Sequence, residues 1–244
     1  STNVGKDIGA SIAEQASTVM EQAVTDLSEY SGNELDESDI MDLNYRYDDN
    51  LIVIYEQLAK ENADNDTVAS GYYSMAIGYC EDYIGILKMK VDEDDSITLG
   101  GTSVNAYNQS YYNKMMTEAR CYDAQGKTDD ALAVYEEAEK VFGTDNEWSD
   151  NVYAEHLDYL YRLCEAKEQD PRLWPAKIPD LTRQLVQVYD NGANVSGIDS
   201  NKTWYKRKDT LQMLKDGNYD AVEEEGTQTQ DETSEDAQSA EMGE

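Results

Sequence analysis

The feature that most constrains this fold is a pair of amphipathic segments that meet at Gly126, within residues 112–145. Ala119 lies three residues before Tyr122 in the first segment, and Ala131 lies four residues before Tyr135 in the second. Alanines let two helix axes approach closely, aromatic rings one turn away fill the space beside them, and a glycine relieves the end of the first helix. The sequence therefore predicts an antiparallel helix pair that turns at Gly126.

The spacing resembles a tetratricopeptide repeat (TPR), whose signature covers about 34 residues. Six residues stand at matching positions: Ala119, Tyr122, Gly126, Ala131, Tyr135 and Ala138. Met115 replaces the usual first Trp, Glu118 a usual apolar residue and Gly143 the closing Pro, so this copy is divergent. The resemblance implies an all-α, TPR-like helical-repeat solenoid of antiparallel helix pairs.

Apolar residues at intervals of three and four predict helices before this pair. We expect a first helix from about Val4 to Ser31, a second helical region over 36–63 that is broken near Asp48, and a third from the N-cap Asp66 to about Lys90. An acidic loop over 91–102 follows. Ala76 lies three residues before Tyr79, as Ala119 does before Tyr122. This repetition favours tandem copies of one helix-pair repeat.

Similar signals follow the pair. Asp145 or Ser149 is expected to cap a helix that reaches Lys167. In this helix Ala154 lies three residues before Leu157, which repeats the spacing of Ala119 and Tyr122. Prolines 171 and 175 then force a break. A helix from Pro179 resembles the second helix of another pair, and a last helix around Trp204 caps the array. This gives an N-terminal helix or stalk over 1–32, a TPR-like array over 33–218 and a disordered acidic tail over 219–244.

Charge and composition exclude several classes of partner. The formal net charge is −33, from 52 acids against 19 bases, and such a surface repels nucleic acid and anionic membranes. The sequence has no apolar run of membrane-spanning length. Ser1 is compatible with a removed Met and with a cut behind a signal or membrane anchor, which leaves the localisation open. The three cysteines have no CxxC spacing and are predicted to be buried thiols.

No motif points to catalysis, a metal or a cofactor. His156 is the only histidine and no serine lies in a GxSxG motif, so we expect His156 to lie on a helix surface or between helices. Residues 92–103 begin like a calcium loop, but Ile97 and Ser103 stand where an EF-hand needs Gly and Glu. The basic cluster 206–208 is expected to form internal salt bridges.

In the TPR family the first helices of successive repeats line a concave groove. The resemblance places eight residues there: Tyr73, Ile77, Asn113, Met116, Arg120, Trp148, Asn151 and Glu155. The alternative is that the aromatic residues cover neighbouring helices. Capture of a C-terminal carboxylate is not favoured, because the groove offers mainly Arg120 as a cation.

The favoured function is a non-catalytic scaffold or adaptor module that binds a protein or peptide, with basic partners suited to its charge. One alternative is an extracytoplasmic sensor or scaffold domain of a membrane-anchored signalling protein, with the N-terminal helix as its stalk. Another is glycan binding, because Tyr and Trp faces with Asp and Asn rims suit sugar rings. A hydrolase on a helical toroid is the weakest, since too few helices are predicted to close a ring.

Overall fold

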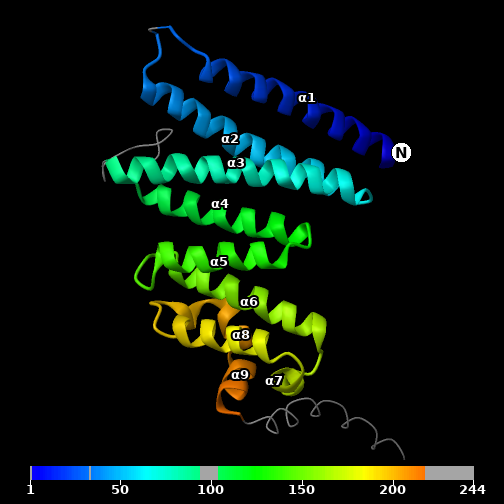
Figure 1. The fold of residues 1–244 in the computed structure, drawn as a ribbon, viewed down its shortest axis with the longest axis vertical. Helices are drawn as coiled ribbons and strands as arrows, with labels where there is room; N and C mark the ends of the chain where they lie inside the picture. Colours follow the sequence, from blue (N-terminus) through cyan, green and yellow to red (C-terminus); the bar gives the residue numbers. More distant parts are fainter. Residues whose placement is uncertain (1, 33, 94–103, 218–244) are drawn as a thin grey trace, which may run out of the picture.

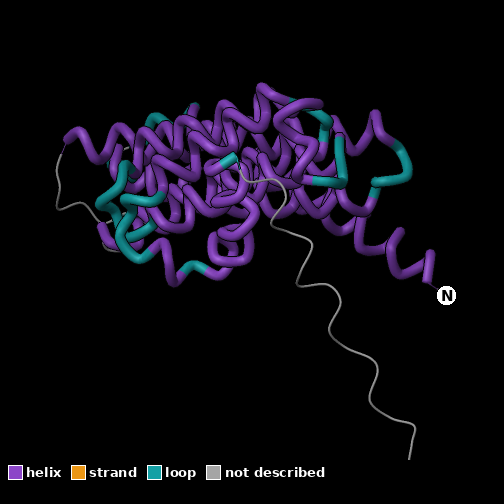
Figure 2. The backbone as a smooth tube through the Cα atoms, turned by 90° about the horizontal axis from the view of Figure 1, so that it is seen from below, coloured by secondary structure: helices purple, strands orange, loops and turns teal. Residues whose placement is uncertain are grey.

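The chain folds into an elongated array of helices. The computed structural model describes residues 2–32, 34–93 and 104–217, and within these ranges Figure 2 shows helices and loops but no strand. The helices follow one another along the long axis, with the N-terminal helix at one end (Figure 1). They are α1 (Thr2–Ser28), α2 (Glu37–Glu61), α3 (Asp66–Glu93), α4 (Val104–Ala124), α5 (Thr128–Phe142), α6 (Ser149–Lys167), α7 (Trp174–Lys177), α8 (Pro179–Gly192) and α9 (Lys202–Asp216), with short 3-10 helices at Pro171–Leu173 and Ile198–Ser200.

Alternate helices form two rows. We call α2, α4, α6 and α9 the first row, and their members are joined by an ion pair from Lys114 to Asp49 and by a hydrogen bond from Tyr159 Oη to Asp123. At the end of this row, Arg207 of α9 pairs with Asp158 of α6. The second row consists of α1, α3, α5 and α8, in which Tyr72 of α3 donates a hydrogen bond to α1. Side-chain contacts therefore join the successive helices of the first row, and they join α1 to α3 in the second.

The predicted helix pair at Gly126 is confirmed as α4 and α5. Ala119 and Ala131 are 1% and 0% exposed, so the close approach that their small side chains permit is used. Gly126 has φ +72°, and the N–H of Lys127 donates to the carbonyl of Tyr122 at 2.9 Å. The left-handed conformation favours glycine and reverses the chain within three residues.

The predicted break near Asp48 is wrong, because α2 runs without interruption from Glu37 to Glu61. The polar residues that indicated a turn are used in other ways. Asp48 is buried between helices, Asp49 pairs with Lys114, and Asn50 donates to the carbonyl of Arg46. Tertiary contacts thus outweigh the local preference of these residues for turns.

The proposed tandem copy at Ala76 is also wrong. Gln125, at the end of α4, donates hydrogen bonds to Ser70 O and Ser74 Oγ, both at 2.7 Å, near the start of α3. The two helices are therefore successive and antiparallel (Figure 1), so Ala76 and Ala119 do not hold equivalent places. Ala154 does lie on a helix parallel to α4, because α6 occupies the same row.

The predicted capping residues of α3 and α6 differ from those in the structure. Asn65 rather than Asp66 accepts the N–H of Val68 at the start of α3. At α6, Ser149 is the first helical residue and its hydroxyl donates to the carbonyl of Phe142, while Asn146 accepts the N–H of Trp148. Asn65 thus caps α3, whereas among the described residues no side chain caps the first turn of α6, and Asn146 acts one residue before that helix begins.

The N-terminal helix packs on the array. The hydroxyl groups of Tyr55 and Tyr79 both donate to Glu21 of α1, at 2.6 and 3.3 Å. On another side of α1, Ile12 and Val19 are 62% and 70% exposed. The helix is therefore joined to α2 and α3 by polar contacts, and part of its apolar surface is uncovered.

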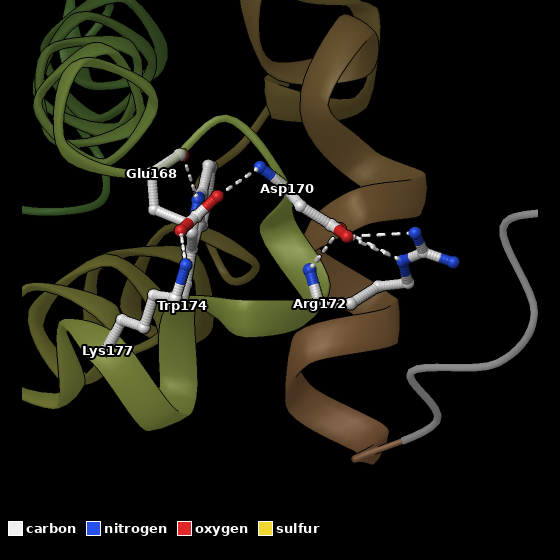
Figure 3. A network of polar contacts seen from close by, with 5 residues as sticks. All are labelled: Glu168, Asp170, Arg172, Trp174 and Lys177. Carbon is white, nitrogen blue, oxygen red and sulfur yellow. Dashed lines mark hydrogen bonds and ion pairs between the residues drawn. The ribbon is translucent and has the colours of Figure 1, made fainter.

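A network of polar contacts closes the connection from α6 to α8 (Figure 3). Trp174 is fully buried, and its indole N–H donates to the carbonyl of Glu168 at 2.6 Å. The Glu168 carboxylate pairs with Lys177 and accepts the backbone N–H of Asp170, whose own carboxylate binds the guanidinium of Arg172 through two nitrogens. This network lets two prolines interrupt the helices while α8 still packs on α6.

The C-terminal helix α9 approaches α8 at Gly192. A Cβ atom placed on Gly192 would lie 2.5 Å from the ring of Trp204, so only glycine fits there. The Trp204 ring stacks on Tyr189, with centroids 5.0 Å apart. Arg207 pairs with Asp158 and Glu165, and Lys208 with Asp199, which confirms the expected internal salt bridges of the basic cluster.

The cysteines are buried thiols, as predicted: Cys80, Cys121 and Cys164 are each 0% exposed. Burial raises the pKa of Cys121 and Cys164 to about 12, so neither is a thiolate at neutral pH. The predicted tail over 219–244 and most of the loop over 91–102 lie outside the described residues.

Candidate functional site

The candidate site is the seam between α4 and α6 on the first row, which we call the α4–α6 face. Asn113 and Arg120 lie seven residues apart on α4 and are exposed. Trp148 precedes the first residue of α6, and Asn151 and Glu155 follow on that helix, all partly buried. The structure therefore brings five of the eight predicted residues to two adjacent, parallel helices.

Trp148 is held at this seam by its neighbours. Its indole stacks on the ring of Tyr112, with centroids 5.0 Å apart and planes inclined by 24°. Its indole nitrogen is buried and has no acceptor within the described ranges of the chain. Aromatic pairs of this geometry stabilise a fold, whereas an unpaired buried N–H opposes it. Trp148 thus packs against Tyr112, and because it is only partly buried it also forms part of the molecular surface.

Tyr112 links Trp148 to the charged residues of the seam. Its hydroxyl donates a hydrogen bond to Glu155. Burial raises the pKa of Tyr112 well above its usual value, the hydrogen bond to Glu155 raises it further, and the charge of Arg120 opposes both. The charge of Arg120 thus acts on the Tyr112 hydroxyl, while the Arg120 side chain itself is exposed.

Arg120 is a cation available for an external contact. Its Nη2 donates to Thr117 Oγ1 at 2.7 Å, and no carboxylate lies within ion-pair distance of it in the part of the chain that the structure describes. Asn151, by contrast, is engaged, because its side-chain oxygen accepts a hydrogen bond from Asn201 at 3.4 Å. The α4–α6 face therefore offers the exposed guanidinium of Arg120 and the exposed amide of Asn113, together with the stacked rings of Tyr112 and Trp148.

The other three predicted site residues lie elsewhere. Tyr73 lines a separate hollow of about 720 Å³ between the ends of α2, α3 and α4. Ile77 and Met116 are 6% and 1% exposed and belong to the hydrophobic core, so a partner cannot reach them in this conformation. Tyr73 and Ile77 lie apart from the α4–α6 face because α3 is an antiparallel neighbour of α4, whereas the TPR resemblance treated the two helices as equivalent.

Sequence reasoning missed Tyr112, which contacts both Trp148 and Glu155. The signal was present in part, since Tyr112, Met115 and Met116 follow helical spacing. It indicated burial but did not indicate that the hydroxyl of Tyr112 would reach a carboxylate 43 residues later in the chain.

The only histidine of the sequence lies between α5 and α6. His156 is 3% exposed, its Nδ1 lies 2.6 Å from Glu139 Oε1, and its ring stacks on Tyr135, so of the two expected placements it has the one between helices. Within the described residues, no group of three or more His, Cys, Asp or Glu is placed to hold a metal ion. Of the described helices, none has the length and apolar character needed to cross a membrane.

Comparison with known proteins adds no relative: no family model matches this sequence, and neither a curated protein nor a solved structure matches it.

Proposed function

We propose that this chain is a non-catalytic protein-interaction module of TPR-like type, and that it binds a protein or peptide on the α4–α6 face. The observation that carries the proposal is the exposed Arg120 on the same helix as Tyr112, whose ring stacks on Trp148. Tryptophan, tyrosine and arginine are the residues that most often dominate the energy of a protein interface. Their presence at one seam supports a binding surface centred there.

The arrangement of helices supports the TPR-like assignment. Antiparallel neighbours, parallel members within a row and the Ala119–Ala131 approach are the features that such repeats share. Hydrogen-bonded residues on α4 and α6, Asp123 and Tyr159, are 36 positions apart, close to the length of one repeat. Under this proposal α4–α5 and α6–α8 are two copies, and the α7 segment is an insertion in the second.

The test captures a partner by its position on the surface. A photo-crosslinking amino acid at Asn113 should form a discrete adduct in cells of the source organism. The same group at Lys140, which is exposed on α5 in the other row, should not form it. Adducts of equal yield from both positions would contradict the proposal.

The affinity of the captured partner then tests the site itself. Replacing Arg120 by Ala should weaken binding by about 2 kcal/mol, or roughly 30-fold, if Arg120 is a hot spot. Arg120→Lys should recover part of the loss, because it keeps the charge but not the planar guanidinium. Unchanged affinity in both variants would place the interface elsewhere.

A further inference from the structure

A hollow of about 380 Å³ lies on the opposite side of α4 from the α4–α6 face. It is bounded by α3 and α5 of the second row and has α4 as its floor, and we call it the α3–α5 groove. Ile84, Met115 and Val134 supply apolar surface from each of the three helices. Gly85 also lines it, and a Cβ placed on Gly85 would meet no atom within 4 Å, so the space beside this helix is open.

Carboxylates surround this apolar surface. Glu81 of α3, Glu118 of α4, and Asp130 and Glu137 of α5 line the groove, against one cation, Lys88. Of these acids, Glu137 has an ion pair, with Lys140 at 3.7 Å, and Glu81 interacts with the Tyr122 hydroxyl. The charge in the groove is therefore negative and largely uncompensated.

Glu118 is the lining acid that belongs to α4, the floor of the groove. It is partly buried, and in the described part of the chain it has no hydrogen bond and no ion pair. Burial raises the pKa of Glu118 to about 7, the neighbouring charge of Glu81 adds to this, and Lys88 opposes it. A carboxyl group in this setting is incompletely ionised at neutral pH, and a cation placed beside it would favour its charged form.

We propose that the α3–α5 groove binds an arginine side chain of a partner protein. The aliphatic part of the side chain lies on Ile84, Met115 and Val134, and the guanidinium lies beside Glu118 within the ring of carboxylates. Arginine fits better than lysine because its guanidinium is weakly hydrated and presents five donors to more than one carboxylate. The groove is distinct from the α4–α6 face, and neither site requires the other.

The proposal is tested on the full chain with a small probe, N-acetyl-arginine methylamide. Methyl groups of methionine are observed by NMR during the titration, because Met115 lines the groove whereas Met75, 40% exposed on α3, does not. We expect a saturable shift at Met115, a weaker one with the lysine analogue and none with the uncharged citrulline analogue. A citrulline shift equal to the arginine shift would overturn the proposal.

Two variants locate the binding. Glu118→Gln should reduce the affinity for the arginine probe at least fivefold, and Gly85→Leu should abolish binding by filling the groove. Gly71→Leu is the matched control on the same helix, since Gly71 is also in open space but outside the groove. Retained binding in both groove variants would mean that arginine associates with the acidic surface in general.

The pH dependence separates this site from surface attraction. The affinity should rise at least threefold between pH 6 and pH 8, because Glu118, which faces Glu81 and Lys88 of α3 and Asp130 and Glu137 of α5, becomes ionised over this range. Glu118→Gln should remove the rise. Arg120→Ala should leave probe binding unchanged, so a failure of the α4–α6 proposal and a failure of this one are distinguishable.

Discussion

The ring of Tyr112 on α4 lies against the indole of Trp148 at the start of α6, with the two planes inclined by 24°. Because this pair joins two first-row helices, Trp148→Ala should lower the free energy of unfolding by about 1–3 kcal/mol. Trp148→Phe should cost less, since it keeps a ring and removes an unpaired N–H. Urea denaturation measures both. The control is Tyr205→Ala, which removes a 68% exposed ring and should change stability by less than about 0.5 kcal/mol.

The approach of α4 and α5 predicts a size limit at Ala131. Ala131→Leu should destabilise the chain by about 1–3 kcal/mol, because a larger side chain at a fully buried position forces the helix axes apart. Ala133→Leu is the control on the same helix, where the side chain is exposed. Thermal denaturation that shows equal shifts for the two variants would mean that the contact accommodates added volume.

Asp48 predicts a dependence of stability on pH. Burial raises the pKa of Asp48 from 3.8 to about 7, and the charge of Asp82 on α3 adds to this. The folded state therefore holds a proton that the unfolded state releases, so this residue's contribution to stability falls as the pH rises from about 4 to 7. Asp48→Asn should remove this loss and stabilise the chain at pH 8 by up to about 4 kcal/mol, given about 1.4 kcal/mol per pKa unit.

The comparison for Asp48→Asn is made by urea denaturation at pH 4.5 and pH 8. At pH 4.5 the variant and the original chain should differ little, since Asp48 is protonated in the folded state. Asp64→Asn, at an exposed position after α2, controls for the general benefit of removing one charge from a chain of net charge −33. A gain of the same size in this control would assign the effect to overall repulsion.

The indole of Trp174 predicts a local effect on the α6–α8 connection. Trp174→Phe should cost about 1–3 kcal/mol, because the carbonyl of Glu168 loses its donor and a buried ring becomes smaller. Hydrogen exchange should speed up first in 168–178. Leu173→Ala, at a residue 40% exposed, should leave exchange in this segment nearly unchanged.

The all-α class and the central helix pair could be predicted from the sequence. Ala119, Gly126 and Ala131 shape contacts within one helix pair, so the local sequence was sufficient to predict them. The extra proline-bounded segment before α8 was predictable for the same reason, since proline restricts its own neighbours.

The order of helices in the two rows could not be read in this way. Ala76 and Ala119 have the same local pattern, but one lies on a second-row helix and the other on a first-row helix. Small residues every few positions indicate a close helix contact without indicating which helix makes it. This ambiguity misplaced Tyr73 and Ile77 in the candidate site.

The face of α4 was predicted only in part. Asn113 and Arg120 are exposed as the groove assignment required, whereas Met116, between them, is buried. Met116 follows Asn113 by three positions, which is nearly a full helical turn, so the two side chains point in similar directions. Whether Met116 meets solvent therefore depends on the width of the gap between α4 and α6. Such a width is set by the side chains of both helices and is not encoded in either one alone.

The approach of α8 and α9 at Gly192 has a consequence for how this chain varies in evolution. The Trp204 ring occupies the volume that any side chain at 192 would need, so the two positions share one space. A lineage that acquires even alanine at 192 is expected to carry a smaller residue at 204, and a lineage that keeps the tryptophan is expected to keep the glycine.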